Sequence, residues 1–220
     1  MGHELIYYLE DTVCEATMDP VPQAPEIQNR YKKVPFFLHI ALLFLLICIN
    51  ALVAKFVVFS FARGPGISSL YVVVALMIAF TLWFGIYGAV AAYAGCSVGA
   101  GILSGLPLDV SLYWSLADLW QVLIPLFAFR YFACDPALKS RRDWIVLIVF
   151  GVFINNSIGS IWGAVTLALG NEIAWAEVLP VFSGWLAGNV IVCLVVLPLL
   201  LWFLTPVIRE HELYIRHYWD

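Results

Sequence analysis

Residues 155–202 read NNSIGSIWGAVTLALGNEIAWAEVLPVFSGWLAGNVIVCLVVLPLLLW, and this stretch decides the fold. It is typical of the back half of one membrane-spanning helix, a short polar connection and a whole second span. Amide side chains at membrane depth are costly unless they are paired or wetted, so we expect them to face a bundle interior. We therefore interpret the two helices as one wall of a polar pocket. The polar residues inside the two spans are Asn155, Asn156, Ser157, Ser160 and Asn189.

Small residues spaced four apart also mark these helices and an earlier one. Such pairs form flat strips that a neighbouring backbone can approach closely, so we predict that they pack helices together. The pairs are Gly159 and Gly163, Gly184 and Gly188, and, in the small-residue stretch 85–104, Gly95 and Gly99.

The composition of the whole chain excludes a soluble globular domain. Of its 220 residues, 63% are hydrophobic and only 12% are charged, and the mean hydropathy is +0.94. The apolar residues form continuous runs of about 20, enough for helices to cross a bilayer, and they do not alternate as in a membrane β-barrel. The sequence therefore predicts an all-α, polytopic transmembrane helical bundle.

We predict about six spans, at residues 35–61, 68–84, 85–104, 111–132, 143–169 and 176–204. The bundle as a whole covers residues 34–205, between a tail of residues 1–33 and a short tail of residues 206–220. The stretch 68–104 is open to two interpretations, either two spans or one span with a re-entrant segment. The first apolar run begins near Val34, behind a polar tail, so we expect no signal peptide.

The basic residues predict the orientation of the bundle. Nine of the eleven fall on one side if both termini are cytoplasmic, as the positive-inside rule requires. Only Lys55 and Arg63 fall toward the other face. We therefore expect a multi-pass protein of the plasma membrane with both tails in the cytoplasm. The nine are Arg30, Lys32, Lys33, Arg130, Lys139, Arg141, Arg142, Arg209 and Arg216.

The cysteines and the net charge argue against several kinds of site and partner. None of the five cysteines has metal-site spacing, and their placement in apolar or cytoplasmic stretches argues against disulfides. We predict that they pack as small hydrophobes, and we expect no metal or cofactor. The net charge of −4 argues against a nucleic-acid partner.

Asp118 is the strongest single candidate for a functional residue in the chain. It shares one face of the predicted fourth span with Trp114, Gln121 and Pro125, one or two turns from the outer end. A carboxyl group there must pair, stay protonated or face water. It is therefore either a ligand contact or proton-linked switch, or a structural hydrogen-bond partner of a neighbouring helix.

The fifth span adds a second candidate surface, on which Asn155, Gly159 and Trp162 share one face and Asn156 lies on the next. Trp162 and Trp185 are candidate pocket walls, with membership of an interfacial aromatic belt as the alternative. No motif for a phosphate loop, an activated nucleophile or a zinc helix is present, so we predict that the protein is not an enzyme. The full candidate ligand-binding set is Trp114, Asp118, Gln121, Asn155, Asn156, Ser160, Trp162, Trp185 and Asn189.

The stretch Gly184–Asn189, followed by Val196–Leu201, resembles the final span of the MASE1 family of integral membrane sensor domains. Asn156–Gly159 with Gly163 resembles the preceding family span, and a looser likeness extends over about residues 70–205. The resemblance implies small-molecule or environmental sensing. Two features depart from the family pattern: Asn189 stands where the family usually has an acid, and members usually have about eight spans followed by a signalling domain.

We expect no output domain after the bundle, so a sensor would signal through a partner chain in the membrane or at the cytoplasmic tails. The same architecture also resembles the substrate-binding component of energy-coupling vitamin transporters, which needs ATPase and coupling partners. A third alternative is a structural accessory subunit of a larger membrane complex. In all three cases the bilayer is a partner, and a small-molecule ligand is expected for the first two.

Overall fold

The structure, a computed structural model, describes residues 35–60 and 69–214. Within these ranges five helical segments are long and apolar enough to cross a membrane, which confirms the helical, multi-pass prediction. They are Phe36–Phe56, Ile86–Ser104, Leu108–Tyr131, Arg141–Leu169 and Trp175–Ile208. The predicted tail of residues 1–33 and Arg63 lie outside the described residues.

Only the first of these five is one uninterrupted α-helix, α3 (Phe36–Phe56). The second is α5 (Ile86–Cys96), continued by the π-helical η1 (Ser97–Gly101) and the 3-10 turn η2 (Ile102–Ser104). The others are composite as well: α6 (Leu108–Trp114) with α7 (Leu116–Tyr131); α8 (Arg141–Val146) with the π-helical η3 (Leu147–Ile154) and α9 (Asn155–Leu169); and the 3-10 turn η4 (Trp175–Glu177) with α10 (Val178–Ile208).

The predicted second span, residues 68–84, is not a full helical crossing. The chain leaves α3 at Phe56, five residues before the predicted end, and forms a short antiparallel hairpin of β1 (Val58–Ser60) and β2 (Ser69–Tyr71). The helix that follows, α4 (Val73–Phe84), has 12 residues. At 1.5 Å per residue it covers about 18 Å of a hydrocarbon core of about 30 Å, so it cannot span alone. The residues around Tyr71 are rich in β-branched and aromatic side chains, which favour the extended form.

Two local devices set helix ends in this fold. Gly85 joins α4 to α5 with a φ of 57°, a left-handed value that favours glycine, and its N–H donates to Thr81 O at 2.8 Å. At the start of α8, Ser140 Oγ accepts from the N–H of Asp143, and the Asp143 side chain accepts from the N–H of Ser140. This reciprocal pair is a capping box, and it begins the long α8–α9 helix sharply.

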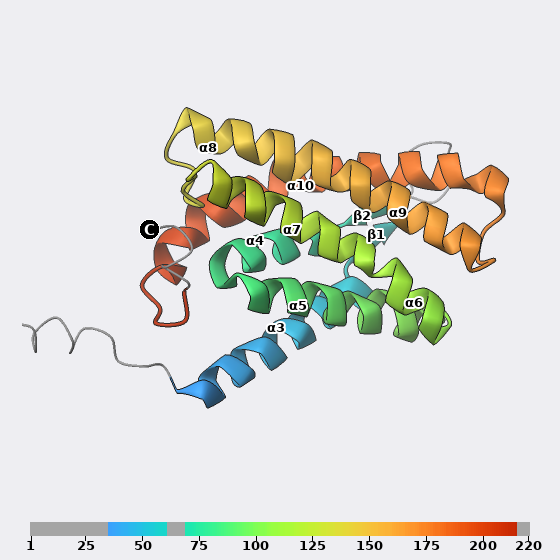
Figure 1. Ribbon diagram of the computed structural model, residues 1–220, viewed down its shortest axis with the longest axis horizontal. Helices are drawn as coiled ribbons and strands as arrows, with labels where there is room; N and C mark the ends of the chain where they lie inside the picture. Colours follow the sequence, from blue (N-terminus) through green and yellow to red (C-terminus); the bar gives the residue numbers. More distant parts are fainter. Residues whose placement is uncertain (1–34, 61–68, 215–220) are drawn as a thin grey trace, which may run out of the picture. The chain divides into compact units, whose positions relative to one another are not determined.

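The helix α7 lies at the centre of the bundle, in contact with α4, α5 and α9, while α10 packs on α4 and α9. Figure 1 shows α3 at one edge and α9 and α10 toward the opposite edge, with α5 and α7 between them. Within α3 only Leu46, Asn50 and Ala54 are buried. The contact of α3 with α5 is nevertheless close, because a Cβ on Gly95 would lie 2.5 Å from Asn50 Cβ.

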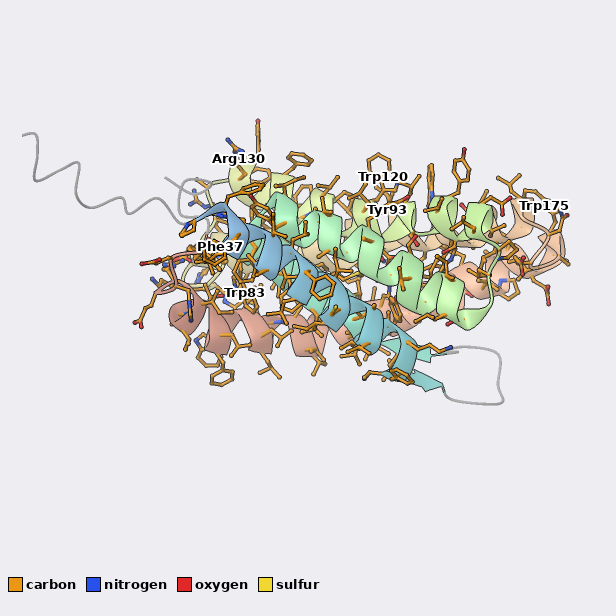
Figure 2. The ribbon with its side chains drawn as sticks, turned by 90° about the horizontal axis from the view of Figure 1, so that it is seen from below. Phe37, Trp83, Tyr93, Trp120, Arg130 and Trp175 are labelled. Carbon is orange, nitrogen blue, oxygen red and sulfur yellow. The ribbon has the colours of Figure 1, made fainter. Side chains whose placement is uncertain are left out.

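The two ends of the bundle differ in charge. Figure 2 shows Phe37 and Arg130 at one end and Trp175 at the other. The connection from α7 to α8 at the Arg130 end carries further basic residues, and Arg209 follows α10 there and pairs with Asp135. Lys55, near the other end of α3, donates from Nζ to Leu103 O in η2 at 2.7 Å.

Candidate functional site

The deepest contacts between α7, α9 and α10 are hydrogen bonds made by amide side chains. Gln121 Nε2 donates to Asn156 Oδ1 at 2.8 Å, and Asn155 Nδ2 donates to Gln121 O at 3.1 Å. Asn156 Nδ2 lies 2.7 Å from Val152 O and 3.4 Å from Cys193 Sγ, both as acceptors. These contacts join three helices at one level. We call Gln121, Asn155, Asn156 and Cys193 the amide layer.

A second level of contact between the same helices is aromatic. The rings of Trp114, at the end of α6, and Trp185, in α10, have centroids 5.5 Å apart. Gly163 of α9 completes this level, since a Cβ there would lie 2.2 Å from Trp185 Cζ3. Only glycine at position 163 lets the indole lie flat on α9. We call Trp114, Gly163 and Trp185 the tryptophan layer.

Three polar residues lie between these two layers. Asp118, Ser160 and Asn189 are each three or four residues from a member of the tryptophan layer and from a member of the amide layer. That spacing keeps each on the same helix face as the layers, and within about 6 Å of both along the helix axis. All three side chains are fully buried. With Gln121, Asn155 and Asn156 they form what we call the interior polar cluster.

The hairpin and α5 close the interior polar cluster on its other side. Tyr71, at the end of β2, donates from its hydroxyl to Cys96 Sγ at 3.4 Å, and Cys96 Sγ lies 3.1 Å from Met77 Sδ. Cys96 ends α5, which contacts α7, the helix that carries Asp118. β2 also contacts α10.

Most of the interior polar cluster has hydrogen-bonding atoms with no partner among the described residues. For Asp118 both carboxylate oxygens lack a donor, and for Asn189 both side-chain amide atoms are unpaired. Each unmatched buried polar group costs about 1–3 kcal/mol, and a charged one costs more. The cluster is therefore an energetically expensive feature of the interior. Further unpartnered atoms there are Gln121 Oε1, Asn155 Oδ1 and Ser160 Oγ.

Departures from regular α-helix coincide with this region. The break between α6 and α7 falls at Ser115, three residues before Asp118, and η3 ends directly before Asn155. η1 begins directly after Cys96. Short π-helical segments and broken helices are frequent at functional sites, because they redirect side chains and loosen backbone carbonyls. Three independent helices are thus irregular next to the same cluster.

The structure gathers eight of the nine predicted ligand-binding residues in this interior, and Trp162 is the one that it places elsewhere. Trp162 is 37% exposed, donates from Nε1 to Tyr113 O at 2.9 Å and packs edge-on against Trp120. It lines a mainly apolar outer groove of about 590 Å³ between α6 and α9. The reason is positional, because Trp162 lies at the margin of the buried face of α9.

Asp118 also lies deeper than its sequence position suggested. We predicted one or two turns from the outer end, but the helix begins at Leu108, so Asp118 is about 15 Å from one end and about 20 Å from the other. Tyr71 and Cys96 were not predicted as part of a site. The only signal for Tyr71 was a lone hydroxyl in an apolar run, in a segment interpreted as helix.

Four of the six predicted packing glycines, Gly95, Gly99, Gly159 and Gly163, lie where two helices approach closely. A Cβ on Gly99 would lie 2.2 Å from Ala51 O, and one on Gly159 would lie 2.4 Å from Gln121 Cγ. Gly184 and Gly188 are buried on α10. The approach at Gly159 is the one that brings Gln121 to the amide layer.

Comparison with known proteins gives no relative from which a function can be carried over. No family model, no curated protein and no solved structure matches this chain. Within residues 35–60 and 69–214 there is also no group of three or more His, Cys, Asp or Glu side chains that could hold a metal ion. The candidate site therefore rests on the geometry of the interior polar cluster.

Proposed function

We propose that this chain is a non-enzymatic sensor of the plasma membrane, similar to MASE1 domains, which binds a small solute at the interior polar cluster and signals through a partner chain. The observation that carries the proposal is Asp118, fully buried near the middle of a spanning-length helix with neither oxygen partnered among the described residues. Intramembrane acids that are left without a protein partner mark ligand or ion sites by default.

The helix α10 gives a physical route from the cluster to the cytoplasmic side. Asn189 contributes to the cluster, and the same helix runs unbroken to Ile208, about 28 Å further along. Arg209 then pairs with Asp135 on the loop between α7 and α8. A shift of α10 upon binding would therefore move the cytoplasmic end, where the basic residues support the assignment of that face.

The test is purification of the full chain in a mild detergent, with mass spectrometry of the proteins that come with it. We expect a soluble signalling protein, recovered in an amount that changes by about threefold or more in Asn189→Leu. Asn50→Leu is the matched control, because Asn50 is also a buried amide without a described partner but lies between α3 and α5.

Other outcomes would overturn the sensor proposal. Copurification of an ATPase pair would make the chain a transport component, as the likeness to vitamin transporters suggests. A fixed stoichiometric membrane complex, unaffected by Asn189→Leu, would make it an accessory subunit. Equal effects of Asn189→Leu and Asn50→Leu would reduce the cluster to a packing feature.

A further inference from the structure

The unpartnered atoms of the interior polar cluster are mostly acceptors. The donors of two amides are already used, because Gln121 Nε2 bonds Asn156 and Asn155 Nδ2 bonds the backbone of α7. What remains unmatched among the described residues is five oxygens of Asp118, Gln121, Asn155 and Ser160, together with the whole amide of Asn189. A site with surplus acceptors is complementary to a cation or to a strong donor.

The charge of the interior polar cluster favours a ligand with a single positive charge. Among the described residues, Asp118 is the one acidic side chain buried away from the ends of a spanning helix, and no described Lys, Arg or His lies within ion-pair distance of it. The described ion pairs belong to Asp135, near the end of the bundle. A divalent cation at Asp118 would leave an uncompensated positive charge in a low-dielectric interior, whereas a monovalent cation leaves none.

The chemistry of the oxygens favours a hard metal cation. Carboxylate, amide carbonyl and hydroxyl oxygens are the ligands that hard cations prefer. The nearby thiols already have partners, because Cys96 contacts Tyr71 and Met77 and Cys193 accepts from Asn156. Transporters likewise coordinate Na⁺ at interrupted helices near the middle of the membrane, where backbone carbonyls are freed. Here Ser115 and η3 supply such interruptions next to Asp118 and Asn155.

Packing argues against a bulky organic cation. The tryptophan layer is tight enough that a single methyl group on Gly163 would overlap Trp185, and a methyl group on Gly159 would overlap Gln121. A metal ion the size of Na⁺ needs far less space than an organic cation.

We propose that the middle of the interior polar cluster is a Na⁺ site, with Asp118 as the charged ligand and Asn189, Ser160 and Gln121 as neutral oxygen ligands. The inference rests on the proposed function in that it names the solute of the same site. It adds that occupancy follows the Na⁺ concentration, so that the protein responds to the cation gradient across the membrane.

The experiment uses the purified full chain in detergent, with NaCl replaced by choline chloride at constant ionic strength. We expect saturable binding of ²²Na⁺ at one ion per chain, and a Tm that rises by several degrees with Na⁺ but not with choline. An ion that binds only the folded state raises stability by mass action, so the Tm should track the same saturation curve. Excess unlabelled K⁺ should displace ²²Na⁺ far less well than excess Na⁺.

Three variants make the assignment falsifiable. Asp118→Asn should abolish ²²Na⁺ binding and the Na⁺ dependence of the Tm, and Ser160→Ala, which keeps the charge, should weaken binding by about tenfold. Asn50→Leu should bind like the wild type. If Asp118→Asn does not fold, Ser160→Ala alone decides, since it removes one oxygen and leaves the packing nearly unchanged.

Wild-type protein that binds no ²²Na⁺ saturably, or Asp118→Asn protein that binds it normally, would overturn the inference. A wild-type Tm that responds to pH and not to Na⁺ would also overturn it, because a proton would then neutralise Asp118. The two proposals fail separately. Na⁺ binding without a signalling partner removes only the sensor function, and a partner whose recovery depends on Asn189 but not on Na⁺ removes only the cation site.

Discussion

Two aspartates are almost fully buried in the described chain, and their surroundings are opposite. Asp143, at the start of α8, is 2% exposed and accepts from the backbone N–H groups of Ser140 at 2.8 Å and Asp135 at 3.2 Å. Asp118, in the middle of the α6–α7 helix, is also buried but has no described donor. One carboxylate is matched by its own fold, and the other is not.

The difference distinguishes two kinds of buried polar site within one bundle. At the Asp143 end, the polar groups hold a loop and a helix start in place. Beyond the capping box, Trp83 Nε1 donates to Thr205 Oγ1 at 2.9 Å and Arg142 donates to Ala133 O at 2.7 Å. In the middle, apolar shape is closely fitted while polar atoms are left over. The fold thus gives Asp143 two backbone donors, whereas no described residue supplies a donor to Asp118.

The largest effect should come from neutralising each aspartate in turn, in Na⁺-free buffer. Asp143→Asn places an NH₂ group against one of the two backbone donors and so breaks either the capping box or the bond from Asp135 N–H, and we expect the free energy of unfolding to fall by about 3 kcal/mol. Asp118→Asn removes a buried charge that no described group compensates, so stability should be unchanged or higher. Denaturant or thermal unfolding in detergent micelles measures both.

The test depends on whether the unfolding free energies of Asp118→Asn and Asp143→Asn change in the same direction. If Asp118→Asn destabilises as much as Asp143→Asn, then Asp118 makes a structural bond and the contrast between the two acids disappears. Ser140→Ala is a useful companion, since it removes the other half of the capping box without changing any charge and should lose about 1 kcal/mol.

The spans could be predicted because continuous apolar runs leave few alternatives to a helix in a bilayer. The failure at residues 68–84 has a local cause. The run there is as apolar as the others, but its start pairs as a strand with Val58–Ser60, a contact that periodicity cannot reveal. The 12 residues of α4 are then too few to cross, and the strand makes up the remaining length.

Most of the candidate site was visible because polar residues are conspicuous where lipid excludes them. Asp118 and the amides were singled out only because polar side chains at membrane depth cost free energy. Three of the amides do meet in the amide layer. Tyr71 and Cys96 were missed because their role depends on how a hairpin strand and α5 approach α7, which no spacing in the sequence encodes. Trp162 was placed in the pocket because helix periodicity fixes a face but not where that face ends.

A smaller effect tests whether the interior is as closely packed as the glycine contacts indicate. In Gly163→Ala the added methyl group overlaps the Trp185 ring, so the free energy of unfolding should fall by about 2 kcal/mol, the usual cost of overpacking. Trp185→Phe puts a smaller ring in place of the indole that the added methyl group would overlap. We therefore expect the double variant to be more stable than the sum of the two single changes predicts, as a double-mutant cycle would measure. Strict additivity would mean that α9 and α10 separate easily, and the contrast between tight shape and unmatched polarity would be lost.

The smallest effect concerns the charged end of the bundle, where Asp135 faces Arg209. Partial burial opposes the Asp135 charge, but hydrogen bonds from Arg209 and from the N–H of Ala137, together with the nearby charge of Lys139, hold the pKa of Asp135 below its usual value. A carboxyl group whose pKa is lowered by folding stabilises the protein above its unfolded pKa of about 4, and that contribution is lost as the pH falls through the folded pKa.

Arg209→Gln should therefore lower the unfolding free energy slightly at pH 6–8, and its difference from the wild type should shrink below about pH 4. Lys139→Gln should act in the same direction but less, because its ion pair is the more exposed. A difference that persists undiminished at pH 3 would assign the role of Arg209 to its contact with Tyr214 and not to the carboxylate.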